Sequence, residues 1–278
     1  MKSPMTKTLG IIAGEGEMPI TVMKSAVLKK IPFVVLNISK RKIRRKSNIK
    51  VINLTVGEIG KGIDFLKKHK CQKIVFAGKP NRPKFSELKI DYKGLKFLPK
   101  IMSSLKIGDS AIFSSIINIF ESQGFQVIAP QDIADDLVSK ENFLTNKKPN
   151  KQDILDIKKG ISIMKSIGKF DIGQAIIVSN GLTVAIEGIE GTDLLIKRSK
   201  ILLDKLGSKS KKQGVLVKLP KPTQDRRIDL PTIGTRTVKL CQKINISGIA
   251  IQSNGTIILE KTKTIKSANQ KGLFLFGF

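Results

Sequence analysis

Residues 9–37 read LGIIAGEGEMPITVMKSAVLKKIPFVVLN, and this stretch decides the fold class. An apolar run is followed by a glycine turn at Gly14 and Gly16. Apolar residues at helical spacing come next, over 19–32, and they lead into a compact β-rich run over 32–38. The stretch therefore predicts a strand, a glycine loop, a helix and a second strand, which together form a βαβ unit.

The same alternation continues through the first half of the chain. Residues 56–70 and 107–124 have the apolar spacing of helices, whereas the runs within 71–83 and 125–130 are typical of strands. Alternating strands and helices indicate a parallel sheet covered by helices. We therefore predict an N-terminal Rossmann-like, parallel-sheet α/β domain over residues 1–138.

A polar segment, residues 139–152, carries few large apolar side chains and is predicted to be a linker. A second α/β domain, with a mixed sheet, is expected over 153–278. Its hairpin should turn at Asn180-Gly181, since Asn-Gly favours the tight turn of a two-residue hairpin loop. The helices and strands expected in this domain lie within 153–171, 173–188, 192–207, 214–220, 235–252, 254–259 and 271–278.

The net charge of +29 in 278 residues raises the question of a nucleic-acid partner. The lysines are spread along the chain, aromatic residues make up only 5%, and there is no tryptophan to stack on bases. The abundance of Ile, Lys and Asn is also the bias that an AT-rich genome imposes. We expect no nucleic-acid partner. The only histidine, His69, lies in a lysine-rich helix end and is expected to be solvated.

The sequence has no apolar run of the ~18 residues that a transmembrane helix needs, and its start does not read as a signal peptide. A cytoplasmic protein is expected. The basic cluster at 39–50 could touch the anionic inner membrane surface transiently, or it could be a solvated loop. Cys71 and Cys241 lack metal-ligand spacing and are predicted to be buried, reduced thiols.

Candidate site residues in the first domain follow predicted strands. The loop with Gly14 and Gly16 could present backbone N–H groups to a phosphate, or it could be a tight structural turn. Gly78 and Arg82 lie in the next glycine loop, which should reach the same sheet edge, where open α/β sheets bind ligands; the alternative is a rigid loop with a solvated arginine. Asp109 could contact a ligand or cap its helix.

The hairpin region of the second domain concentrates acidic and polar residues in a basic chain. Carboxylates that converge there would suit Mg²⁺, a hard cation that accepts oxygen ligands. Alternatively, Thr192 or Asp193 caps a helix while the glutamates face solvent. The residues concerned are Gln174, Glu187, Glu190, Gly191, Thr192 and Asp193.

Residues 218–238 read KLPKPTQDRRIDLPTIGTRTV and combine dense charge with three prolines. Lys218 and Lys221 could pair with phosphates, and Asp225 and Asp229 could bind a metal or polarise a water molecule. The two arginines at 226 and 227 could stabilise charge on a transferred phosphoryl group. A charged surface loop is the alternative, although the prolines argue against a floppy one.

Taken together, these motifs resemble the UDP-2,3-diacylglucosamine pyrophosphatase family of LpxI type, which acts in lipid A biosynthesis. The resemblance covers nearly the whole chain and rests on GIIAGEGEMP, AGKPNRP, GDSAIF, ESQGF, DIGQAIIV, AIEGIEGTD and KPTQDRRIDLPTIGTRTV. It implies two α/β domains that hold the substrate between them. It also implies Mg²⁺-dependent hydrolysis of the UDP-sugar pyrophosphate to UMP and 2,3-diacylglucosamine 1-phosphate, with attack on the sugar-side phosphorus.

The resemblance also implies residue roles. Asp225 looks like the essential acidic residue, and Asp225 and Asp193 are taken as the metal ligands. The chain departs from the family pattern at Ser110 and Gln252, where acidic residues are usual, which leaves the ligand contacts there open. The implied substrate-binding residues are Gly14, Gly16, Gly78, Arg82, Asp109, Gln174, Glu190, Gly191, Thr192, Asp193, Lys218, Gln224, Asp229 and Thr232.

Two competing functions stay open at this point. A non-catalytic nucleotide-sugar binding or regulatory module would keep the glycine loops but would need no acidic residues in its site. A nucleic-acid-binding protein would use the charge of +29 and would bind with steep salt dependence. The chain could also form a homo-oligomer.

Overall fold

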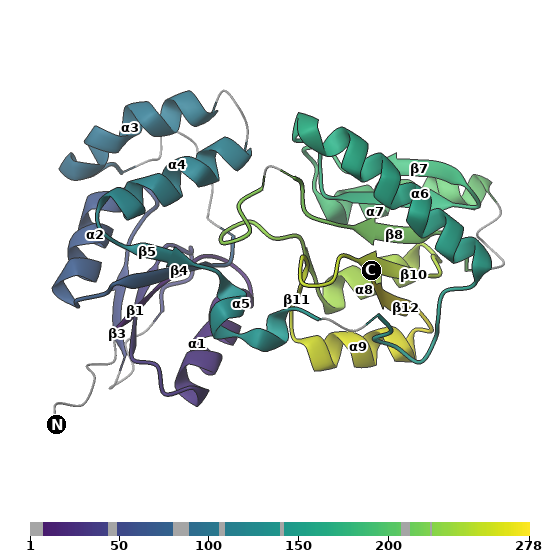
Figure 1. Ribbon diagram of the computed structural model, residues 1–278, viewed down its shortest axis with the longest axis horizontal. Coiled ribbons are helices and arrows are strands. Elements are labelled where there is room, and N and C mark those ends of the chain that lie inside the picture. The colour runs from purple at the N-terminus through teal and green to yellow at the C-terminus, as the bar shows by residue number, and fades with distance from the viewer. Residues whose placement is uncertain are drawn as a thin grey trace. The chain divides into compact units, whose positions relative to one another are not determined.

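The computed structural model describes residues 8–43, 49–79, 89–105, 109–139, 142–206, 212–222 and 224–278. The chain forms two compact units, each with its own sheet and helices (Figure 1). The N-terminal unit comprises Met1–Asp135 together with Arg227–Asp229, and the C-terminal unit comprises Asp136–Arg226 together with Leu230–Phe278. The predicted α/β class is confirmed in both.

The N-terminal unit is built on a five-stranded, all-parallel sheet with the order β3-β2-β1-β4-β5. The strand order reverses between β1 and β4, since β2 and β3 lie on one side of β1 while β4 and β5 lie on the other. In open α/β sheets, ligands bind at such a switch point, beyond the carboxyl ends of the strands. The strands are β1 (Leu9–Ala13), β2 (Phe33–Asn37), β3 (Lys50–Asn53), β4 (Lys73–Ala77) and β5 (Gln126–Ile128).

Helices cover both faces of this sheet, as its buried strands require. Side chains alternate along a strand, so Leu36 packs with α2 and α4 on one face while Val35 lies with Met23 of α1 on the other. Helix α3 packs on α2 and α4 (Figure 1). The helices are α1 (Met18–Leu28), α2 (Ile59–Lys68), α3 (Tyr92–Leu105), α4 (Asp109–Ser122), α5 (Pro130–Ile133) and the 3₁₀ turn η2 (Asp135–Leu137).

The C-terminal unit has a mixed sheet with the order β12-β10-β8-β6-β7, in which β12, β10 and β8 are parallel and β6 is antiparallel to both neighbours. The predicted hairpin turn is confirmed: Asn180 and Gly181 both have positive φ, at 50° and 76°. The strands are β6 (Ala175–Ser179), β7 (Leu182–Ile186), β8 (Val215–Lys218), β10 (Gly248–Ile251) and β12 (Phe274–Gly277). A separate two-stranded parallel sheet is formed by β9 (Thr232–Ile233) and β11 (Ile257–Ile258).

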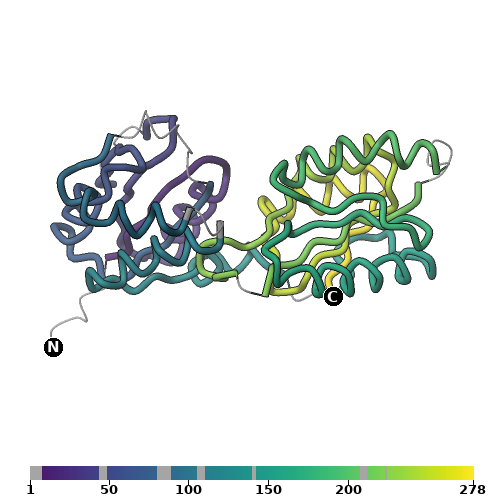
Figure 2. Tube along the Cα trace, turned by 90° about the horizontal axis from the view of Figure 1, so that it is seen from above, coloured from purple at the N-terminus to yellow at the C-terminus, as the bar shows by residue number. Residues whose placement is uncertain are grey.

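Helices also cover both faces of the mixed sheet. Figure 2 shows α6 and α7 on opposite sides of it, and each helix contributes to a separate apolar cluster. Ile157 and Met164 of α6 pack on one face, and Leu195 and Leu203 of α7 pack on the other with α8 and α9. The helices are α6 (Lys151–Ile167), η3 (Gly168–Phe170), α7 (Thr192–Lys205), α8 (Thr235–Lys243) and α9 (Lys261–Gln270).

The segment expected to be a linker, 139–152, differs from that expectation where the structure describes it. Leu144 is buried in the core of the C-terminal unit, and its backbone N–H donates to the carbonyl of Leu275 at 3.0 Å. The buried Thr145 hydroxyl accepts the N–H of Leu275 at 2.8 Å. One apolar side chain and paired backbone groups are enough to attach this polar segment to the edge of the sheet.

Both cysteines, Cys71 and Cys241, are free and buried, as predicted. Burial raises the pKa of the Cys71 thiol to about 11, so this side chain stays protonated at neutral pH. Across the described ranges, none of the helices combines the length and the apolar character needed to cross a bilayer.

Candidate functional site

The two glycine loops of the N-terminal unit meet at the switch point between β1 and β4. The N–H of Gly14 donates to the carbonyl of Ala77 at 2.8 Å. Beyond it, Glu15 and Lys79 exchange backbone hydrogen bonds, N–H to carbonyl, at 2.7 and 3.1 Å. The structure thus confirms the expectation that both loops lie at one sheet edge.

Glycines are needed where the two loops pair, because their backbones approach closely. A Cβ on Gly14 would lie 2.4 Å from the carbonyl oxygen of Lys79, and one on Gly78 would lie 2.5 Å from the carbonyl oxygen of Glu15. Gly78 and Gly16 also have φ of +90° and +95°. The backbone N–H groups of Gly14 and Glu15 donate to carbonyls of the neighbouring glycine loop. These two N–H groups therefore stabilise a tight structural turn, which was the alternative to a phosphate site.

Polar side chains tie the neighbouring strand ends to the same edge. The Glu15 carboxylate accepts the backbone N–H of Lys40 at 2.6 Å. Asn37, at the end of β2, is 1% exposed and donates its amide to Asn53 at 2.8 Å. These bonds hold the described start of the predicted basic cluster against the sheet; residues 44–48 of that cluster lie outside the described ranges.

Two predicted residues of this unit have no described side chain. Arg82 falls in 80–88, outside the described ranges. Asp109 is the first residue of α4, as its expected place near a helix N-terminus requires, but its side chain is likewise outside the description.

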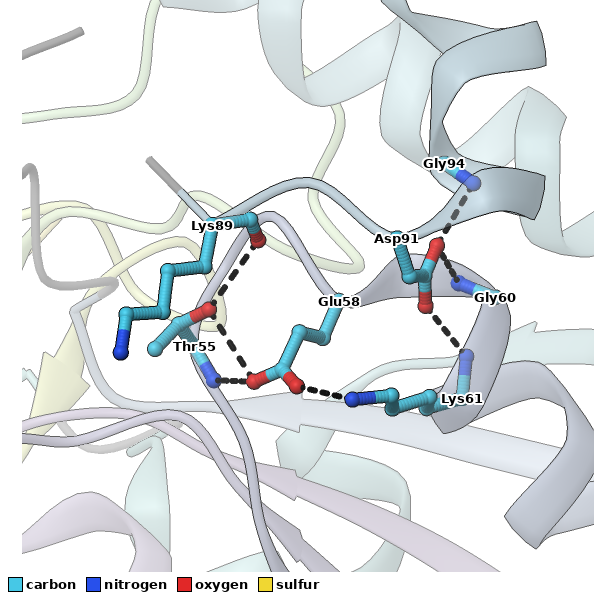
Figure 3. A network of polar contacts seen from close by, with 7 residues as sticks. All are labelled: Thr55, Glu58, Gly60, Lys61, Lys89, Asp91 and Gly94. Carbon is cyan, nitrogen blue, oxygen red and sulfur yellow. Dashed lines mark hydrogen bonds and ion pairs between the residues drawn. The ribbon is translucent and has the colours of Figure 1, made fainter. Parts of the chain in front are cut away.

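A carboxylate that sequence reasoning missed fixes the chain just after 80–88 (Figure 3). Asp91 accepts backbone N–H groups from Gly60 at 3.2 Å, Lys61 at 2.7 Å and Gly94 at 2.6 Å. It therefore caps the first turns of α2 and α3 together. The signal was present in the sequence, since an aspartate that precedes a helix by one residue is a usual N-cap.

Glu58 adds a second tie in the same network (Figure 3). Its carboxylate accepts the Nζ of Lys61 at 2.7 Å and the backbone N–H of Thr55 at 2.9 Å. The hydrogen bond from Lys61, followed by that from Thr55, lowers the pKa of Glu58 below its ordinary value. The Thr55 hydroxyl in turn donates to the carbonyl of Lys89 at 3.4 Å.

In the C-terminal unit, the acidic residues of the hairpin region point to different partners. Glu190 pairs with Arg198 at 2.7 Å, and this contact is the main cause that lowers the pKa of Glu190. Asp193 pairs with Arg236 at 2.6 Å, while Glu187 accepts the hydroxyl of Thr192 at 3.1 Å.

The predicted convergence of Glu187, Glu190 and Asp193 on a metal is therefore wrong. Within the part of the chain that the structure describes, no group of three or more His, Cys, Asp or Glu side chains is arranged to hold a metal ion. The alternative prediction, that Thr192 or Asp193 caps the helix, is wrong as well. Gly191, with φ of +78°, is the N-cap of α7, and Thr192 and Asp193 are its first two residues.

A buried lysine joins four elements of this unit. Lys218, at the end of β8, is 5% exposed, and its Nζ donates to the Thr192 hydroxyl at 2.7 Å and to the Thr232 carbonyl at 3.0 Å. The Thr192 hydroxyl donates onward to Glu187 at the end of β7. A buried ammonium needs hydrogen-bond partners to offset lost hydration. The predicted residues Lys218, Thr192 and Thr232 are thus brought together, and they fix a positive charge at the carboxyl end of β8.

Gln174 lies at this same edge. Its carbonyl accepts the N–H of Leu219, which directly follows Lys218, at 3.1 Å. The neighbouring Gly173 has φ of +37°, and a Cβ there would lie 2.1 Å from the carbonyl oxygen of Glu187. The start of β6, the end of β7 and the end of β8 therefore meet at one point.

The charged segment that follows β8 is anchored at its start. Lys221, predicted to meet a phosphate, instead pairs with Asp171 at 2.5 Å, and its side chain is only 8% exposed. Gln224 is buried and its side-chain oxygen accepts the N–H of Lys221 at 3.1 Å. This anchored backbone leads directly to the half-buried Asp225.

The next three residues, Arg227–Asp229, belong to the N-terminal unit. Ile228 packs against the apolar cluster of that unit, and Arg227 pairs with Glu121 of α4 at 2.6 Å. The segment thus contributes to both compact units, which its many charges did not indicate. Asp229 is half-buried in this short stretch, and the chain then returns to the C-terminal unit at Leu230.

Comparison with known proteins follows the same division of the chain. Residues 8–137 match the LpxI N-terminal domain, and residues 140–276 match the LpxI C-terminal domain. The chain is also 30% identical over 272 residues to the UDP-2,3-diacylglucosamine pyrophosphatase LpxI of Caulobacter vibrioides, covering 98% of this chain and 97% of that protein. With both domains matched in order and nearly end to end, the chain belongs to the LpxI family.

Proposed function

We propose that this protein is a UDP-2,3-diacylglucosamine pyrophosphatase of lipid A biosynthesis. It would hydrolyse the pyrophosphate bond to give UMP and 2,3-diacylglucosamine 1-phosphate. The observation that carries the proposal is the near full-length match to a relative of that name, 30% identical over 98% of the chain. An enzyme of this kind would work in the cytoplasm, where UDP-sugars are made.

Asp225 is proposed as the catalytic carboxylate. It follows Gln224, which is buried and held by Lys221, and it precedes residues fixed in the N-terminal unit by Arg227. A side chain on a backbone anchored on both sides is positioned in advance, and such positioning favours orientation of an attacking water molecule. Asp225 would orient that water toward the sugar-side phosphorus and take up its proton.

Lys218 is proposed to supply a fixed positive charge. Pyrophosphate hydrolysis adds negative charge as UMP leaves, and a buried ammonium at the carboxyl end of β8 stabilises such charge without reorganisation. Thr192 and Thr232 hold the ammonium in place. At the N-terminal sheet edge, a Cβ on Gly16 would have no neighbour within 4 Å, so Gly16 leaves room for a nucleotide phosphate close to the backbone.

We further infer that the reaction depends on Mg²⁺. The described residues form no preformed carboxylate cage, and Asp193 is paired with Arg236. Mg²⁺ usually keeps several waters and binds one or two carboxylates plus substrate phosphates, which suits so sparse a donor set. Asp225 and Asp193 are the residues proposed to hold it. When bound, the ion would offset the negative charge of the pyrophosphate.

One assay tests the proposal. The purified protein is incubated with UDP-2,3-diacylglucosamine in detergent micelles, with Mg²⁺ or with a chelator, and UMP is measured. UMP release that requires Mg²⁺ supports the full proposal, and release without it retains the hydrolase but rejects the metal. Tight binding without any UMP would instead indicate a nucleotide-sugar binding protein.

A further inference from the structure

The outer face of α3 carries an exposed apolar stripe. Tyr92 is 81% exposed, Leu95 is 51% exposed and Met102 is 37% exposed, and the exposed Pro99 lies between them. Positions 92, 95, 99 and 102 fall on one side of a helix. We call these four residues the α3 stripe. Soluble proteins usually bury such a row, so its exposure calls for a partner.

Lysines line one edge of the α3 stripe. Lys93, Lys96 and Lys100 are all exposed and follow the stripe at helical spacing, and Tyr92–Leu105 contains no acidic residue. Lys93 is held by Asp64 at 2.6 Å. Besides Lys93, which is paired, the face therefore combines apolar side chains with the positive charges of Lys96 and Lys100 along a single helix.

The opposite face of α3 is fully used by the fold. Phe97 and Ile101 pack against the apolar cluster beneath the helix, and the buried Ser104 contacts Ser115 of α4 at 2.5 Å. Figure 1 shows α3 on the side of α4 away from the sheet. The packing therefore places the α3 stripe on the outside of the unit.

The start of α3 is held rigidly. Asp91 accepts the N–H of Gly94 and two N–H groups of α2, so the two helices begin from one carboxylate (Figure 3). A Cβ on Gly94 would lie 2.8 Å from that carboxylate and 2.9 Å from the carbonyl oxygen of Gly57. The α3 stripe is thus a preformed surface, and no folding step is needed before it can bind.

We propose that this face of α3 docks the protein on an anionic lipid bilayer. Apolar side chains that enter the headgroup region beside lysines that contact anionic headgroups are the pattern of interfacial helices. A tyrosine suits that depth, because its ring is apolar and its hydroxyl is polar. A second copy of the chain fits less well, since two lysine-lined stripes on chains of net charge +29 would repel each other.

The docking surface does not depend on the proposed reaction, so binding and turnover can fail separately. Tyr92 makes a direct test feasible, because the chain has one tyrosine and no tryptophan. The full chain is mixed with phosphatidylcholine vesicles that contain either no anionic lipid or about 30% phosphatidylglycerol, at about 0.15 M salt. Brominated acyl chains should quench Tyr92 fluorescence only in the anionic vesicles.

Two α3 variants are compared with matched variants of α6. K96A/K100A should weaken vesicle binding about fivefold for each lysine and so roughly 25-fold for the pair. L95S/M102S should weaken it about tenfold through lost apolar burial. The controls K151A/K158A and L155S remove exposed side chains of the same kinds from α6 and should bind as the wild type does.

Each outcome decides the proposal. It is overturned if the wild type does not bind anionic vesicles, or if the α6 controls lose as much affinity as the α3 variants. It is also overturned if the wild type is a dimer in light scattering that L95S/M102S dissociates, because the occupant is then a second copy. Release of UMP from micellar substrate should be the same for all variants, which separates this inference from the proposed reaction.

Discussion

Replacing Asp91 by alanine should destabilise the N-terminal unit by about 3 kcal/mol. The carboxylate accepts three backbone N–H groups at 2.6–3.2 Å from the first turns of α2 and α3. Loss of an N-cap costs about 1 kcal/mol. Loss of a negative charge at a helix N-terminus costs about 0.5 kcal/mol more. Two helices lose both contributions at once, which gives the total.

Tyr92, the residue after Asp91, reports this change locally, since the sequence has no other tyrosine and no tryptophan. With a urea dependence of about 2 kcal/mol per molar, D91A should lower the midpoint of the Tyr92 fluorescence transition by about 1.5 M. Asp91→Asn keeps one acceptor oxygen but turns an amide toward a backbone N–H, so its midpoint should fall about half as far.

A matched control lies in the other unit. Asn150 caps α6 by accepting the N–H of Asp153 at 2.8 Å, so Asn150→Ala removes one cap far along the chain from Tyr92. It should leave the Tyr92 transition in place while lowering the midpoint seen by far-ultraviolet circular dichroism. The reasoning about a shared cap would be refuted if D91A and the wild type showed the same Tyr92 midpoint.

Three further outcomes are expected. Because the hydrogen bond from Lys61 lowers the pKa of Glu58 below its ordinary 4.5, Glu58 stabilises the fold above that pH and loses this contribution as the pH falls. Urea unfolding from about pH 6 to about pH 3 should therefore show a shallower loss of stability for E58Q than for the wild type. Lys218→Met should reduce UMP release about 100-fold at a temperature where the variant is still folded, since it removes the fixed charge but keeps the apolar stem, and unchanged turnover would exclude the role given to Lys218. Its melting temperature should also fall, because the Thr232 carbonyl loses its donor. Hydrolysis in ¹⁸O-water should place the label in 2,3-diacylglucosamine 1-phosphate, and label in UMP would show attack on the uridine-side phosphorus.

Much of the fold could be predicted because its signals are local. The apolar run, glycine turn and helical spacing of 9–37 identify β1, α1 and β2 from neighbouring residues alone. The Asn180-Gly181 pair identifies the β6–β7 turn in the same way. Helix α3 was missed, because Gly94 and Pro99 interrupt its sequence and its outer face is apolar rather than polar.

The candidate site was harder to predict, because its geometry depends on contacts between distant residues. Asp193 pairs with Arg236, 43 positions along the chain, and no local pattern in the sequence indicated that contact. Lys218 was singled out for its charge, but its burial against Thr192 comes from the meeting of β8 and α7. The place of Ile228 in the N-terminal unit likewise has no local signal.

The most direct test of the proposed function is UMP release by the wild type and by Asp225→Ala from the same UDP-2,3-diacylglucosamine micelles. Asp171→Ala, which removes another carboxylate at the anchored start of the segment, serves as the comparison. The wild type should release UMP, Asp225→Ala should bind the substrate without releasing UMP, and Asp171→Ala should retain measurable turnover. Full turnover by Asp225→Ala would contradict the assignment of the catalytic residue, and failure of the folded wild type to release UMP would contradict the proposed reaction itself.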